Sequence, residues 1–138
     1  MACPFCDPVR NRDRTLKNGK LVYVILSDPR LVFGHLLIIP KRHVEKLSQL
    51  TAEERKELIG TAVEFQEKIL EKIAEGCDLR QNYRPFQKED GIKVNHLHLH
   101  LLPRELHDNL YQQFQIYETG VFRPLSKEES KELTGKLC

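Results

Sequence analysis

A run of seven residues, His96-Leu97-His98-Leu99-His100-Leu101-Leu102, alternates histidine with leucine. Successive side chains of a β-strand point to opposite faces, so the three imidazoles would form one row at a spacing of roughly 6.5 Å. A helix would scatter them around its axis. The run therefore predicts a strand over residues 94–102, with leucines on a buried face and His96, His98 and His100 on the other.

The hydrogen-bonding groups of three imidazoles in a row are hard to pair inside an apolar core. Each has a donor and an acceptor, and each can gain charge near neutral pH. The simplest alternative is the water-exposed outer face of an edge strand. The polar stretch 80–91, which we interpret as a loop, precedes the strand and favours an open site beside the histidines.

The other elements have clear sequence signals. Residues 21–26 and 36–39 are short apolar runs bounded by turn residues, and Pro40 ends the second run, so both are predicted strands. From Thr51, apolar residues recur at three and four positions and predict a helix from about Ala52 to Glu75, with Gly76 as its stop.

The C-terminal part holds a further possible strand near Phe114 to Tyr117. Ser126 and Glu129 form a second capping box, which predicts a short C-terminal helix. Together the elements indicate the α+β class with an antiparallel sheet.

Length and charge limit the alternatives. The 138 residues are 40% hydrophobic, enough for one core, so we expect a single domain over residues 1–138. The 22 basic and 20 acidic residues are mixed along the chain, which gives no reason to expect a nucleic-acid or membrane partner. No signal segment or membrane-length apolar run is present, so we expect a cytoplasmic protein.

Of the four cysteines, only Cys3 and Cys6 have the spacing of a metal ligand pair. A reducing compartment would keep such thiols free of disulfides. Two thiols are half of the four ligands that a structural zinc ion needs.

The histidine run resembles the signature of the histidine-triad nucleotide-binding family over all seven positions. Upstream, Gly34-His35, the apolar strand and Pro40-Lys41-Arg42-His43 resemble the family's Gly-His and Pro-Lys-x-His segment. The resemblance covers roughly residues 3–104 and leaves 105–138 as a C-terminal extension. It implies a mostly antiparallel five-stranded sheet with one long helix and the short C-terminal helix, commonly in a homodimer.

The resemblance also implies roles in catalysis. His98 would attack the α-phosphorus of a nucleotide, giving a nucleotidyl-histidine that water or another acceptor resolves, with a main-chain carbonyl of the triad orienting its ring. His100 would contact the phosphate or protonate the leaving group. His35 would line the same pocket, although a satisfied core histidine is the alternative. Ser27 or Asp28 would bind the ribose, and Asp28 is chemically the better candidate.

The chain departs from the family just before the triad. Relatives carry Gly-Gln-Ser/Thr there, whereas this chain has Gly91-Ile92-Lys93, and isoleucine cannot hydrogen-bond to phosphate. Lys93, with Asn82 and other polar residues of the loop, could meet a phosphate chain. We therefore hypothesise an altered leaving group, a polyphosphate or an anionic acceptor.

Members of this family with an N-terminal Cys-x-x-Cys, and the related galactose-1-phosphate uridylyltransferases, supply two histidines to a zinc site. The matching positions are His43 and His96, which with Cys3 and Cys6 would make a structural Cys2His2 site. The alternative is a pair of free surface thiols beside a solvated basic turn.

The expected function is a nucleotide hydrolase or nucleotidyltransferase acting at the α-phosphorus, on a nucleoside phosphoramidate or a dinucleoside polyphosphate with adenine or another purine as base. The third histidine favours hydrolysis. Two alternatives are a zinc hydrolase in which triad histidines hold a catalytic metal ion, and a nucleotide-binding regulator with little activity.

Overall fold

The computed structural model describes residues 3–90 and 92–138. The chain forms two compact units, Met1–Asp108 and Asn109–Cys138. We describe each unit by itself. The interpretation of the whole chain as a single histidine-triad domain stays a prediction.

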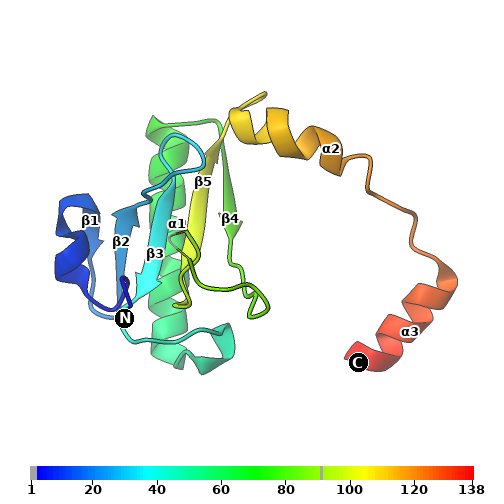
Figure 1. Cartoon of the computed structure of the whole chain (residues 1–138), viewed down its shortest axis with the longest axis horizontal. Coiled ribbons are helices and arrows are strands. Elements are labelled where there is room, and N and C mark those ends of the chain that lie inside the picture. Colours follow the sequence, from blue (N-terminus) through cyan, green and yellow to red (C-terminus); the bar gives the residue numbers. More distant parts are fainter. Residues whose placement is uncertain (1–2, 91) are drawn as a thin grey trace. The chain divides into compact units, whose positions relative to one another are not determined.

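The first unit contains a five-stranded sheet in which every neighbouring pair of strands is antiparallel (Figure 1). The α+β class and the five-stranded antiparallel sheet are thus confirmed. The order across the sheet is β1-β2-β3-β5-β4. The strands are β1 (Thr15–Asn18), β2 (Val22–Leu26), β3 (Leu36–Pro40), β4 (Gly76–Arg80) and β5 (Leu99–Arg104).

The long helix α1 (Ala52–Lys72) covers one face of the sheet. It begins with the predicted capping box, in which Thr51 and Glu54 bond to each other's backbone N–H groups. Its apolar stripe packs on alternate residues of the central strands, which form the main core. The core includes Val22, Val24, Leu36, Ile38, Leu58, Ala62, Phe65, Ile69, Leu97, Leu99 and Leu101.

The central strands are also covered on their second face. Tyr23, Ile25, Leu37 and Ile39 form a smaller cluster with Phe5 of the N-terminal segment. That segment continues into the short 3-10 helix η1 (Pro8–Arg14), and a second one, η2 (Leu47–Gln49), precedes α1. Residues 22–25 of β2 and all of β3 are therefore buried.

The end of α1 differs from the prediction. The helix stops at Lys72, not Glu75, and Gly76 is the first residue of β4. A Cβ at Gly76 would lie 3.3 Å from the Arg104 carbonyl oxygen on the paired strand. The glycine therefore permits close strand pairing and does not stop the helix.

The histidine strand is shorter at its start than predicted. Only Leu99–Arg104 pairs as β5, and residues 94–98 follow an irregular path. The Leu97 N–H donates to the Val44 carbonyl (2.7 Å), which draws this segment toward the loop after β3. The predicted burial of the leucine face is confirmed, with Leu97, Leu99 and Leu101 each at most 3% exposed.

The second unit is helical. The predicted strand near Phe114 to Tyr117 is wrong, because residues 111–115 form a π-helical turn (η3, Tyr111–Gln115) that continues into α2 (Ile116–Glu118). The local i→i+5 hydrogen bond from Ile116 to Tyr111 satisfies backbone groups that a strand would leave for a partner. The C-terminal helix α3 (Lys127–Leu137) is confirmed, with Ser126 and Glu129 as its capping box.

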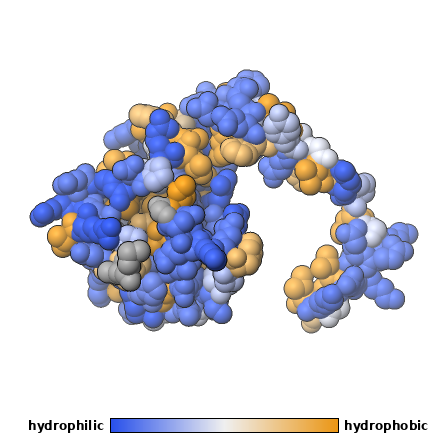
Figure 2. Space-filling view, in the orientation of Figure 1, coloured by the Kyte–Doolittle hydropathy of each residue, from blue (hydrophilic) through white to orange (hydrophobic). Residues whose placement is uncertain are grey.

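Strands β1 and β4 were not predicted. Both are short and mostly half-buried or exposed, so neither carries a strong apolar pattern. Figure 2 shows polar residues over much of the visible face of the first unit. Within the described ranges, no helix has the length and apolar character to cross a membrane.

Candidate active site

A cleft of about 910 Å³ lies on the face of the sheet opposite α1. Its walls come from the N-terminal segment, the loop between β2 and β3, the loop after β4, and the triad segment. The cleft brings together most of the predicted catalytic and nucleotide-binding residues: Ser27, Asp28, His35, Asn82, Lys93, His98 and His100. His96, a predicted metal ligand, lines it as well. Gly91 lies outside the described residues.

His98 has its ring orientation set by the backbone. Its Nδ1 lies 2.7 Å from the His96 carbonyl oxygen, so Nδ1 carries the proton and donates. The Nε2 lone pair is therefore available, and no hydrogen bond from Nε2 to another described residue is formed. The edge of the Phe5 ring packs against the imidazole at a centroid distance of 5.2 Å. Burial lowers the pKa of His98, which favours the neutral ring.

His35 and His100 form a hydrogen-bonded pair beside it. The Leu31 N–H donates to His35 Nδ1 (3.1 Å), so His35 carries its proton on Nε2 and donates to His100 Nδ1 (2.9 Å). His100 must then carry its own proton on Nε2. The His100 ring lies 4.7 Å from the His98 ring, centroid to centroid.

Both members of this pair are uncharged at neutral pH. Burial is the main cause for both; the neighbouring histidines and Arg80 add to it. The pKa of His35 falls to about 4 and that of His100 to about 3. His100 therefore offers an N–H donor with no net charge.

Cys3, Cys6, His43 and His96 lie together beside the cleft, with one ligand atom of each within 4.8 Å of all the others. The Sγ of Cys3 lies 3.3 Å from His96 Nδ1, and the Sγ of Cys6 lies 3.2 Å from His43 Nδ1. Ligands about 2.0–2.3 Å from a tetrahedral zinc ion are separated by about 3.3–3.8 Å. The close sulfur–nitrogen separations of 3.2–3.5 Å and the two-sulfur, two-nitrogen donor set therefore fit zinc.

The surroundings of this cluster also suit a metal ion. His96 Nε2 donates to the Pro40 carbonyl (2.7 Å), which leaves Nδ1 unprotonated and directed at the thiols. The loop that carries the cysteines is held by Tyr23, whose hydroxyl donates to the Phe5 carbonyl (2.6 Å). Burial and the neighbouring Cys3 thiol raise the pKa of the Cys6 thiol, and a bound cation would offset both effects.

The predicted nucleotide-binding residues differ in whether their polar groups are exposed or already bound to the backbone. The Ser27 hydroxyl donates to the Pro29 carbonyl (2.8 Å), whereas the Asp28 carboxylate is exposed at the rim. Asn82 is also exposed. The Lys93 ammonium donates to the backbone carbonyls of Arg84 and Gln87, so it holds the loop together.

Sequence reasoning missed Arg80 and Phe5, which both line the cleft. Arg80 fell at the boundary between an unrecognised strand and the loop that follows it. Phe5 lies between two cysteines and was considered only as part of that spacing. Its contact with His98 has no local sequence signal, because 93 residues separate the two positions.

Comparison with known proteins identifies the family. The family model described as the HIT domain matches residues 10–107, and the chain therefore belongs to this family. Its fold is that of solved HIT-family structures. One of them, a zinc-bound histidine-triad protein from Mycobacterium smegmatis, has a TM-score of 0.65 and 25% identity, and the match covers 94% of this chain and 87% of that one.

Two curated relatives are named for reactions of nucleotides. An AP-4-A phosphorylase from Mycobacterium tuberculosis (strain CDC 1551 / Oshkosh) is 30% identical over 89 residues, which are 62% of this chain and 44% of the relative. An adenosine 5′-monophosphoramidase from Schizosaccharomyces pombe is 27% identical over 141 residues, covering 96% of this chain and 93% of the relative. The chain thus spans less than half the length of the mycobacterial relative.

Proposed function

We propose that this protein is a nucleotide hydrolase or nucleotidyltransferase that acts at the α-phosphorus through a nucleotidyl intermediate on His98. The observation that carries the proposal is the tautomer in which the His98 ring is held. Its Nδ1–H is bound to the His96 carbonyl, and its unprotonated Nε2 belongs to a residue that lines a large cleft. A neutral imidazole fixed in one tautomer is a suitable nucleophile at neutral pH.

In the first step, the Nε2 lone pair attacks the α-phosphorus. The new N–P bond forms as the bond between phosphorus and the leaving group breaks, and the leaving group departs with that electron pair. The His98 ring becomes cationic, and the hydrogen bond from Nδ1 to the His96 carbonyl stabilises the charge. Asp28, at the cleft rim, is the proposed partner of the ribose hydroxyls.

In the second step, a water molecule attacks the same phosphorus and the N–P bond breaks, with its electron pair returning to Nε2. A proton of the water passes to solvent, and a nucleoside monophosphate is released. A different acceptor in place of water gives transfer. In both steps His100 donates a hydrogen bond from Nε2 to the phosphate. His35 holds His100 in the tautomer that makes this possible.

His100 is better suited to hydrogen bonding than to protonating the leaving group. Because the pKa of His100 is about 3, the ring is neutral at pH 7 and has no acidic proton to give to a leaving group. A leaving group that is stable as an anion needs no proton from it. This argument favours a polyphosphate over an amine as the leaving group.

We propose that Cys3, Cys6, His43 and His96 hold a structural zinc ion. Bound there, zinc would tie the N-terminal segment to the triad segment and fix the position of His96. The His96 carbonyl, which orients His98, belongs to the same residue. A catalytic metal shared by His96 and His98 is disfavoured, because His96 Nδ1 is directed at the thiols.

The family resemblance further leads us to propose a homodimer that acts in the cytoplasm on purine nucleotides. Both edge strands of the sheet, β1 and β4, have a free hydrogen-bonding side within the described part of the chain. Sedimentation of the purified protein at micromolar concentration tests the dimer. A monomer mass at all concentrations would contradict it.

The function is tested with a panel of adenosine 5′-phosphoramidate, diadenosine tetraphosphate and a nucleotide sugar. His98→Ala should lose at least about 1,000-fold in kcat on every substrate that the wild type converts. Wild type quenched during turnover should show an acid-labile nucleotidyl adduct by mass spectrometry, resistant to chelators. The matched control is His107→Asn, since His107 is exposed and its φ of 65° is tolerated by asparagine. Full activity of His98→Ala would refute the proposal.

A further inference from the structure

Arg80 is the last residue of β4 and lies directly opposite His100 of β5. Opposed residues of an antiparallel pair have side chains on the same face, with Cβ atoms about 4.5–5.5 Å apart. Both residues line the cleft. The Arg80 side chain therefore enters the cleft beside the imidazole that contacts the nucleophile.

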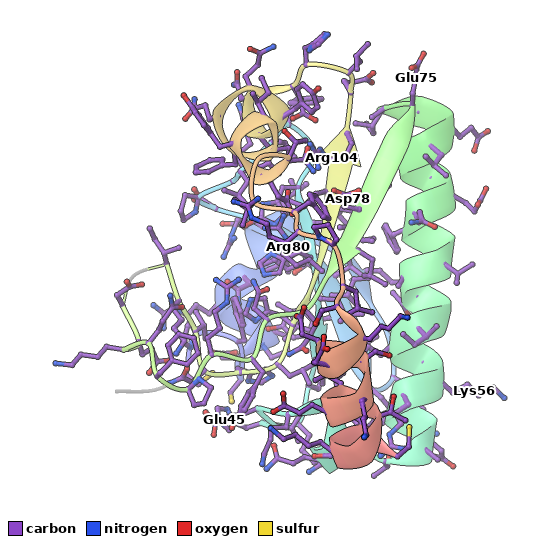
Figure 3. The ribbon with its side chains drawn as sticks, turned by 90° about the vertical axis from the view of Figure 1, so that its right-hand side faces the viewer. Glu45, Lys56, Glu75, Asp78, Arg80 and Arg104 are labelled. Carbon is purple, nitrogen blue, oxygen red and sulfur yellow. The ribbon has the colours of Figure 1, made fainter. Side chains whose placement is uncertain are left out.

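The charges next to Arg80 on this face are already paired with one another. Asp78, two residues earlier on β4, forms an ion pair with Arg104 Nη1 (2.5 Å), and Arg104 Nε donates to Asp108 (2.7 Å). Figure 3 shows Arg104, Asp78 and Arg80 along this side of the sheet, with α1 on the other side.

The guanidinium of Arg80 forms no ion pair and no side-chain hydrogen bond with any residue that the structure describes. The cleft contains two carboxylates, Asp28 and Glu45, and neither is paired with it. A permanent cation without a partner, half-buried in a cleft, is available to an anionic ligand.

Four further arginines, Arg10, Arg14, Arg30 and Arg84, line the cleft, but Arg80 is the arginine that lies directly opposite His100 in the sheet. The His35 and His100 pair is neutral at pH 7 and donates hydrogen bonds only. The Lys93 ammonium is bound to loop carbonyls. A cation beside His100 would stabilise a leaving group with several phosphates, and the planar guanidinium matches two phosphate oxygens at once.

We propose that Arg80 binds a phosphate of the leaving group and so selects substrates whose leaving group is anionic. The inference rests on the proposed function, since it assigns the leaving-group side of the same site. Arg80 acts as a specificity residue. It contacts the part of the substrate beyond the α-phosphate and takes no part in transfer of the nucleotidyl group to His98.

The test compares wild type, Arg80→Gln and Arg80→Lys in binding and in turnover. Binding is measured by calorimetry with inorganic tripolyphosphate and with AMP. Arg80→Gln should weaken tripolyphosphate binding about 10- to 150-fold, the range for charged hydrogen bonds, and AMP binding less than about 3-fold. Arg80→Lys should fall between, because lysine keeps the charge but not the bidentate fork. Arg55→Gln, an exposed arginine of α1, is the matched control.

In turnover, Arg80→Gln should lower kcat/KM for diadenosine tetraphosphate by about 10- to 150-fold. Its kcat/KM for adenosine 5′-phosphoramidate should stay within about 3-fold of the wild-type value. Equal losses on both substrates would overturn the inference, as would unchanged tripolyphosphate affinity. If the wild type converts neither substrate but tripolyphosphate binding depends on Arg80, Arg80 is a phosphate-binding residue, whereas its selection of the leaving group fails together with the proposed function.

Discussion

Glu54 connects the start of α1 to the loop that carries His43, and we predict that Glu54→Gln destabilises the protein at neutral pH but not near pH 2. The carboxylate is 5% exposed and accepts hydrogen bonds from Arg42 Nη2 (2.7 Å) and the Thr51 N–H (2.8 Å). The Arg42 contact is the main cause that lowers the pKa of Glu54 to about 2. Glutamine keeps the capping box through its amide oxygen, so the substitution removes the charge and the second acceptor oxygen, Oε2, to which Arg42 Nε donates (3.2 Å).

The size of the effect follows from the two pKa values. A fall from 4.5 in the unfolded chain to about 2 in the folded one corresponds to about 3 kcal/mol. Because the Arg42 side chain is 52% exposed, solvent screens the pair, and we expect about 1–2 kcal/mol. The folded-state pKa is the lower one, so this stability is present above pH 4.5 and is lost as the pH falls toward 2.

Urea unfolding of wild type and Glu54→Gln at pH 7 and at about pH 2 measures the difference. Glu64→Gln is the matched control, since Glu64 pairs with Lys17 and Lys68 at the surface and should contribute about 0.5 kcal/mol or less. A difference of the same size at both pH values would refute the reasoning, because it would not come from the charge of Glu54.

Three further predictions concern the metal site and the loops of the cleft. Purified protein should contain zinc, as measured by metal analysis. The zinc should be lost in Cys3→Ser, and also below about pH 5 because its ligands must be deprotonated; zinc retained in either sample would contradict this. Gly34→Ala should cost about 1–3 kcal/mol by thermal denaturation and displace the neighbouring His35, since its φ is +84° and a Cβ would lie 3.0 Å from Pro103 Cγ, whereas Gly60→Ala meets no atom and should not destabilise. Lys93→Ala should speed hydrogen exchange over residues 84–93, because it removes two bonds to loop carbonyls; unchanged exchange would contradict this.

Local sequence patterns were sufficient to predict the elements whose residues interact with others only a few positions away. The capping boxes at Thr51 and Ser126 predicted where α1 and α3 begin, because each box involves residues three positions apart. The alternation of leucine predicted the buried face of the triad segment for the same reason. The family resemblance placed Cys3, Cys6, His43 and His96 in one cluster, as the structure has them.

Features that depend on distant residues were decided only by the tertiary structure. Residues 94–98 leave the strand because Val44 and Pro40 bind their backbone and side-chain groups, and no local pattern encodes that contact. Gly76 opens a strand because Arg104 lies against it. Arg80 faces the cleft because β4 pairs with β5 in a register that puts it opposite His100. The sequence by itself determined which residues could carry the chemistry, whereas strand pairing determined which of them lie together, because hydrogen bonds between strands join residues far apart in the chain.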